Sequence, residues 1–176
     1  FGDPEQRNKL GPLMGSITAA GAAEKDATAF VAWLDQQPQV DKTKKIGTQG
    51  YCMGGPLVVR TAATVPARIG AGASFHGGGL VTPNPDSPHL LAGKIKARMY
   101  FGVATNDDMQ QPDAKVKLKE AFEAAKVPAE VEVYANAQHG WCVSDMPTQP
   151  NGEPIYNAAE ADRAWARLLA LYGAGL

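Results

Sequence analysis

The chain alternates segments with helix-like and strand-like hydrophobic patterns, and this alternation constrains its fold more than any other feature. Apolar residues at three- and four-residue spacing predict helices over about 17–34, 53–65, 113–125 and 165–172. Between them, short apolar runs predict strands at 69–75 and 98–104. A less apolar segment that ends in glycines predicts a strand at 45–51, and an alternation of polar and apolar residues predicts one at 130–135. Such alternation implies right-handed crossovers and a mostly parallel sheet with helices on both faces. The predicted fold class is α/β.

The composition excludes several classes of function. The 176 residues carry 17 Lys and Arg against 18 Asp and Glu, for a net charge of −1, and we expect one domain over residues 1–176. This balance argues against nucleic acid or an anionic membrane surface as a partner. No apolar run reaches the length of a membrane span. The two cysteines, Cys52 and Cys142, suit a reducing compartment, which indicates a cytoplasmic location.

A cysteine between glycines follows the first predicted strand, in the segment GYCMGG of residues 50–55. A sharp strand-to-helix turn strains its corner residue, and glycines two residues before and after it relieve the crowding, as in the G-x-S-x-G nucleophile elbow. The helix N-terminus would stabilise a thiolate, so we predict Cys52 as a nucleophile. The N–H of Met53 would then face the oxyanion of a tetrahedral intermediate. The alternative is a buried structural cysteine.

A cysteine nucleophile needs a base, and the base needs a group that orients it. His139 follows the strand predicted at 130–135 and is the candidate base, with a surface-loop histidine as the alternative. An acid after the strand at 98–104 would hold the imidazole in its working tautomer. Asp107 and Asp108 fit this role equally well by spacing. Whichever of the two does not orient the imidazole would cap a turn.

Further residues near the predicted strand ends have several possible roles. The HGGG segment at 76–79 resembles an oxyanion motif of lipases, but that motif precedes the nucleophile, whereas this segment follows Cys52. We expect Tyr51, His76 and Trp141 to line a substrate pocket, although each fits core packing as well. The histidines have no metal-ligand spacing and no C-x-x-C pair is present, so we expect no metal or cofactor. Cys142 is expected to be structural.

These motifs together resemble the dienelactone hydrolase family of the α/β-hydrolases. The resemblance rests on residues 50–55, on SFHGG at 74–78, on Asp107 with Pro112 five residues later, and on His139 followed by Gly140. It extends from about Ser16 onward and implies an α/β-hydrolase fold. It also implies hydrolysis of a small carboxylic ester or lactone, with Cys52 as nucleophile, Asp107 as orienting acid and His139 as base. It favours Asp107 over Asp108 and implies no cofactor; we expect a monomer or a small homo-oligomer.

The chain departs from the family pattern in two places. The opening residues 1–13 are polar, contain Pro and Gly and are expected to form a loop, whereas the family has its first sheet strands before the elbow. That part of the family also supplies a second oxyanion N–H and an acidic residue near the cysteine. We therefore expect the native protein to be longer, with the four strands here forming the second half of the sheet and leaving an apolar edge. Val143 replaces an arginine that holds a substrate carboxylate in family members, so the resemblance does not extend to a dienelactone as substrate.

Two other classes of function remain open at this point. One is a hydrolase-fold protein without catalytic activity that binds a small molecule or a partner; slow, ordinary alkylation of Cys52 would favour it. The other is a thiol-dependent redox protein, which would require Cys142 to lie close enough to Cys52 to form a disulfide.

Overall fold

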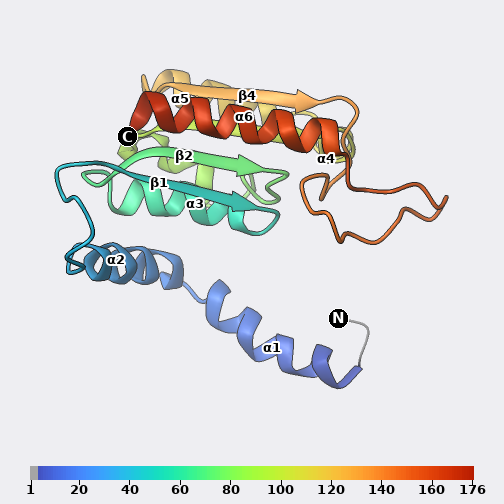
Figure 1. Ribbon diagram of the computed structural model, residues 1–176, viewed down its shortest axis with the longest axis horizontal. Coiled ribbons are helices and arrows are strands. Elements are labelled where there is room, and N and C mark those ends of the chain that lie inside the picture. Colours follow the sequence, from blue (N-terminus) through green and yellow to red (C-terminus); the bar gives the residue numbers. More distant parts are fainter. Residues whose placement is uncertain (1–3) are drawn as a thin grey trace.

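The computed structural model describes residues 4–176, and a fully parallel four-stranded sheet forms its centre (Figure 1). The strands are β1 (Ile46–Tyr51), β2 (Ile69–Phe75), β3 (Arg98–Ala104) and β4 (Ala129–Tyr134), in the spatial order β1-β2-β3-β4. Each lies within one residue of the strand predicted from sequence. The α/β class and the parallel sheet are therefore confirmed.

Helices cover both faces of the sheet. One face is covered by the segments that connect the strands: α3 (Gly54–Thr64), the 3₁₀ helix η1 (Pro88–Lys94) and α5 (Ala114–Ala124). They share this face because each strand is added on the same side of the one before it and all the crossovers have the same hand. The last helix, α6 (Ala158–Gly175), packs against β2 and β3 from the other face. Strand β3 shows this division, since Met99 and Phe101 belong to the core under α3 and α5, whereas Tyr100 belongs to the core under α6.

The N-terminal prediction is wrong in two respects. Residues expected to form a loop are part of α1 (Pro4–Thr18), while residues 1–3 lie outside the described part of the chain. The helix expected over 17–34 is interrupted, and α2 (Ala22–Leu34) begins anew after Gly21, whose φ of 74° breaks the helical path. On α2 the side chains of Ala27 and Val31 are buried, but Phe30, expected on the same apolar face, is 67% exposed.

Strand β1 forms one edge of the described sheet, and a groove of about 300 Å³ lies beside it. Phe30, Val31 and Ile46 contribute apolar side chains to this groove. The expectation that further strands cover this edge stays a prediction. None of the helices within residues 4–176 is long and apolar enough to cross a membrane.

Candidate functional site

The residues singled out from sequence follow the carboxyl ends of four neighbouring strands. Cys52 directly follows β1, and His76 directly follows β2. Asp107 lies in the short helix α4 (Thr105–Gln110), which begins where β3 ends and was not predicted. His139 lies in the loop after β4. Because Tyr51 pairs with Phe75 in register, the first two strands end at the same level and bring their loops together.

Cys52 occupies the strained corner of a strand–turn–helix element. Its φ of 52° lies in the left-handed region, which non-glycine residues seldom adopt, and its side chain is exposed. A Cβ on Gly50 would lie 2.2 Å from the carbonyl oxygen of Gly54, so position 50 requires glycine. At position 54, in contrast, a Cβ would meet no atom within 4 Å, so the steric role expected for that glycine is wrong.

The tight contact after the elbow occurs one residue later. A Cβ on Gly55 would lie 2.4 Å from Ser74 Oγ and 2.7 Å from Gly77 Cα. The second essential glycine therefore allows α3 to pack closely against the end of β2, rather than relieving the turn itself. Met53 is the N-cap residue of α3, and the N–H groups that begin a helix have no intrahelical acceptor.

Asp107 and His139 form a hydrogen-bonded pair. The distance from Asp107 Oδ2 to His139 Nδ1 is 2.8 Å, and both side chains are about three-quarters buried. Asn106, which was not singled out from sequence, accepts a hydrogen bond from the backbone N–H of His139 through Oδ1 at 2.8 Å. Asp108 instead forms an ion pair with Lys115 at 2.6 Å, so the two neighbouring acids have separate partners.

The imidazole of His139 lies between Asp107 and the thiol of Cys52. The hydrogen bond to Asp107 is the main cause that raises the pKa of His139 from 6.5 to about 9, and the nearby thiol of Cys52 and the charges of both groups act in the same direction. Partial burial acts in the opposite direction, because desolvation disfavours the imidazolium. The arrangement therefore favours a protonated His139 near neutral pH, with Nδ1 held by the carboxylate of Asp107.

His76 is buried behind this group, with 2% of its surface exposed, and contacts the elbow directly. Its Nδ1 accepts a hydrogen bond from the backbone N–H of Cys52 at 3.1 Å, and its φ of 42° is also left-handed. Its ring centre lies 4.8 Å from that of His139. Burial, and then the charge of His139, lower the pKa of His76 to about 4, so it is neutral at pH 7. Its Nε2 has no hydrogen-bond partner among residues 4–176.

The aromatic residues expected in the pocket lie mainly inside the protein. Trp141 is fully buried and stacks on Tyr134 with ring centres 4.7 Å apart. Tyr51 is half-buried and stacks on Phe75 at 5.4 Å. In the structure these side chains pack behind the site. Contacts of Tyr51, His76 and Trp141 with substrate stay a prediction.

Cys142 has a different environment from Cys52. Burial raises the pKa of the Cys142 thiol to about 12, and neither cysteine forms a disulfide in the described chain. Within residues 4–176, no group of three His, Cys, Asp or Glu side chains is placed as a metal site requires. The residues that the fold brings together at the strand ends supply a thiol, an imidazole and a carboxylate.

The model of the family described as "Dienelactone hydrolase family" matches residues 1–175. The chain belongs to the dienelactone hydrolase family. Its fold is the α/β-hydrolase fold, and the resemblance drawn from the elbow and the loop residues is confirmed at the level of family and fold.

Relatives of the dienelactone hydrolase family match over part of their length. A protein of Aquifex aeolicus named "Putative carboxymethylenebutenolidase" is 25% identical over 122 residues, covering 69% of this chain and 48% of its own. "Protein usf" of Aquifex pyrophilus is 26% identical over 129 residues, which cover 73% of this chain and 51% of the relative. The chain thus spans about half the length of these curated relatives.

Solved structures place the whole chain within the same fold. The structure named "m3DLH" is 25% identical and has a TM-score of 0.74, covering 100% of this chain and 70% of its own. The dienelactone hydrolase-like promiscuous phosphotriesterase P91 from metagenomic libraries is 24% identical with a TM-score of 0.72, covering 93% and 66%. At that identity the second likeness bears on the fold alone.

Proposed function

We propose that this protein hydrolyses carboxylic esters or lactones through an acyl-enzyme on Cys52, with His139 as acid and base and Asp107 as the orienting acid. One observation carries the proposal: a thiol at a strained elbow lies near an imidazole whose Nδ1 is held by a carboxylate at 2.8 Å. Nucleophile, base and orienting group in this arrangement are the requirements of acyl transfer. Membership of the dienelactone hydrolase family supports the same class of reaction.

In the first half-reaction, His139 takes the proton of the Cys52 thiol, and the resulting thiolate attacks the carbonyl carbon of the ester and forms a C–S bond. The negative charge moves to the carbonyl oxygen, to which the N–H of Met53 would donate a hydrogen bond. As the intermediate collapses, the C–O bond to the alcohol breaks and the His139 imidazolium gives its proton to the departing oxygen. The products of this step are a neutral alcohol, a thioester and a neutral imidazole.

In the second half-reaction, neutral His139 takes a proton from water, and the resulting hydroxide attacks the thioester carbon. The C–S bond then breaks, which restores the thiolate beside the imidazolium and releases the carboxylic acid. Asp107 keeps its charge throughout and holds the imidazole in one orientation. The sum of the two steps is ester plus water giving acid plus alcohol.

His76 supports the elbow in this scheme without contacting the reacting atoms. Its Nδ1 accepts the Cys52 N–H, and its contact with the His139 ring keeps that ring in place. A protonated His76 could not accept the hydrogen bond, so its neutrality is part of the arrangement.

The proposal is tested by measuring hydrolysis of phenyl acetate and of a dienelactone side by side, together with the intact mass of the protein. The full chain should hydrolyse at least one of them and show an acetyl adduct on Cys52 with phenyl acetate. Cys52→Ala should lose turnover by about 1,000-fold or more, while Cys142→Ala, the matched control, should retain it. Turnover that survives in Cys52→Ala contradicts the mechanism; an inactive chain whose Cys52 reacts slowly with iodoacetamide favours a small-molecule binding protein.

A further inference from the structure

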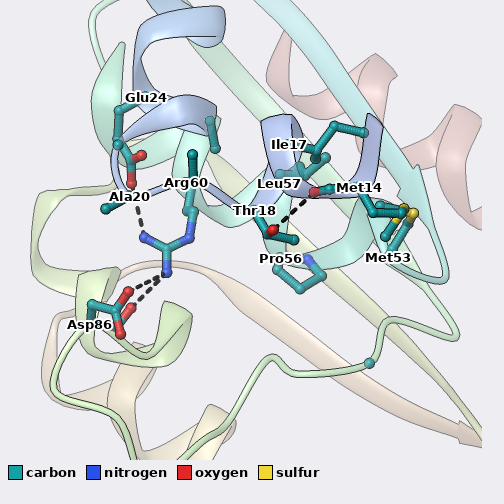
Figure 2. A pocket seen from close by; sticks show the side chains of 14 residues that line it. Met14, Ile17, Thr18, Ala20, Glu24, Met53, Pro56, Leu57, Arg60 and Asp86 are labelled. Carbon is teal, nitrogen blue, oxygen red and sulfur yellow. Dashed lines mark hydrogen bonds and ion pairs between the residues drawn. The ribbon is translucent and has the colours of Figure 1, made fainter. Parts of the chain in front are cut away.

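A pocket of about 350 Å³ lies beside the elbow and has no role in the scheme above (Figure 2). It is bounded by the end of α1, the turn before α2, the first part of α3 and the loop after β2. Met53, which follows Cys52, and Gly78, which lies two residues after His76, are part of its wall. The pocket therefore begins next to the residues that would hold the reacting ester.

Apolar side chains form one side of this pocket. Figure 2 shows Met14 and Ile17 from α1 beside Met53 and Leu57 from the elbow and α3, with Pro56 next to them. The hydroxyl of Thr18, on the same side, already donates to the carbonyl oxygen of Met14 at 2.8 Å. An occupant of this side would thus meet hydrocarbon and sulfur, which favours a group without polar atoms.

Charged side chains form the opposite side, and they neutralise one another. Arg60 Nη1 lies 2.9 Å from Glu24, and Arg60 Nη2 lies 3.1 Å from Asp86 Oδ2 and 2.9 Å from the Asp86 carbonyl oxygen. Arg60 is the one cation among the described residues that line the pocket, and it faces two carboxylates there. The lining therefore carries a formal charge of −1 and offers a substrate carboxylate no unpaired cation.

We infer that this pocket binds the uncharged hydrocarbon part of the substrate, an aliphatic or aryl acyl or alcohol group, and that it selects against anionic esters. The inference rests on the proposed function for the identity of the occupant. Each methylene that becomes fully buried lowers the dissociation constant by about fourfold, so partial burial gives about twofold for each carbon. The ratio of kcat to KM should rise by about that factor for each carbon from acetyl to hexanoyl esters.

Binding of an unreactive ligand tests the pocket independently of turnover. Protein labelled with ¹³C in its methionine methyl groups is titrated with 2-octanone, which is neutral, and with octanoate, which is anionic. The Met14 and Met53 signals should shift with 2-octanone, while Met109, which is 76% exposed and outside the pocket, should not. Octanoate should bind at least about fivefold more weakly. Absence of shifts at Met14 and Met53, or equal affinity for the two ligands, overturns the inference.

Two pairs of variants separate the apolar and the charge arguments. Ile17→Ser should weaken 2-octanone binding about fivefold, whereas Leu13→Ser, on the same helix but outside the pocket and 59% exposed, should not. Glu24→Gln removes one partner of Arg60 and should raise octanoate affinity relative to 2-octanone about threefold or more, whereas Asp26→Asn, which makes the same charge change on α2, should not. Equal effects within either pair reject the corresponding argument.

The same titration distinguishes failure of the pocket from failure of the proposed function. Cys52→Ala should bind 2-octanone as the unmodified chain does, because the thiol does not line the pocket. A chain that binds 2-octanone but hydrolyses no ester would contradict the acyl-enzyme scheme while keeping the pocket. A chain that hydrolyses esters with no dependence on chain length would contradict the pocket while keeping the scheme.

Discussion

Replacing Asp107 by asparagine removes the carboxylate that holds His139 and changes one oxygen to an amide nitrogen of similar size. The hydrogen bond that His139 donates to Asp107 is the largest contribution to the raised pKa of His139, which is about 9 in place of 6.5. At about 1.4 kcal/mol for each pKa unit, this difference means that the folded protein favours the imidazolium form of His139 by roughly 3 kcal/mol. Asp107→Asn should therefore bring the pKa of His139 back by at least one unit toward 6.5.

NMR titration of the histidine ring signals measures this change without any assay of activity. The chain has three histidines, so assignment needs only single substitutions. Asp108→Asn is the matched control, because Asp108 pairs with Lys115 and not with His139. His139 should titrate near 9 in the unmodified chain and in Asp108→Asn, and clearly lower in Asp107→Asn. A His139 that titrates alike in all three proteins would refute the argument.

The same substitution has a consequence for stability with a definite sign. The folded pKa of His139 lies above its unfolded value, so its contribution is complete below pH 6.5 and is lost as the pH rises through about 9. The free energy of unfolding should fall by up to about 3 kcal/mol across this window in the unmodified chain. In Asp107→Asn at least about 1.4 kcal/mol of that fall should be absent, as urea denaturation at pH 6 and pH 9.5 would report.

Three further predictions concern the elbow and its surroundings. Gly50→Ala should destabilise the fold by several kcal/mol in urea denaturation, because its Cβ meets backbone, while Gly54→Ala, which meets nothing, should change stability by less than about 1 kcal/mol. Iodoacetamide at pH 7.5 should modify the exposed Cys52 and leave Cys142, whose thiol has a pKa of about 12, as peptide mass mapping would show; equal labelling would contradict this. His76 has a folded pKa below its unfolded value, so stability should fall as the pH drops from 6.5 to about 4, and His76→Gln should flatten that decline in thermal denaturation.

The strands were predictable because their signal is local. A short apolar run between turn residues predicts a strand, whichever strand becomes its neighbour in the sheet. The strands at 69–75 and 98–104 have the predicted bounds. The N-terminal region was not predictable in this way, because α1 buries little of its apolar side, and so its pattern was weak. The break before α2 depends on the backbone of a single glycine, Gly21, which sequence spacing does not reveal.

The candidate site was predictable in its members but not in its pairings. Strand ends in a parallel sheet share one edge, so Cys52, Asp107 and His139 were expected to lie together. Asp107 and Asp108 are neighbours with the same chemistry, so their spacing did not distinguish them and only the family resemblance favoured Asp107. In the structure, Asp107 in the short helix α4 is the one that contacts His139. Asn106 could have been noticed, because a polar side chain beside the chosen acid is placed to hold the same loop, but its role depends on the fold of the loop after β4.

The amino-acid sequence by itself determined the class of fold, the family and the kind of chemistry that the chain carries. These depend on periodicity and on short motifs, whose physical causes lie within a few residues of one another. The tertiary structure decided what depends on distance between segments far apart: the burial of His76 beneath Cys52, the interior position of Trp141, and the pairing of Arg60 with Glu24 and Asp86. Electrostatic and packing energies depend on separation in space, and separation in space is settled only once the sheet has assembled.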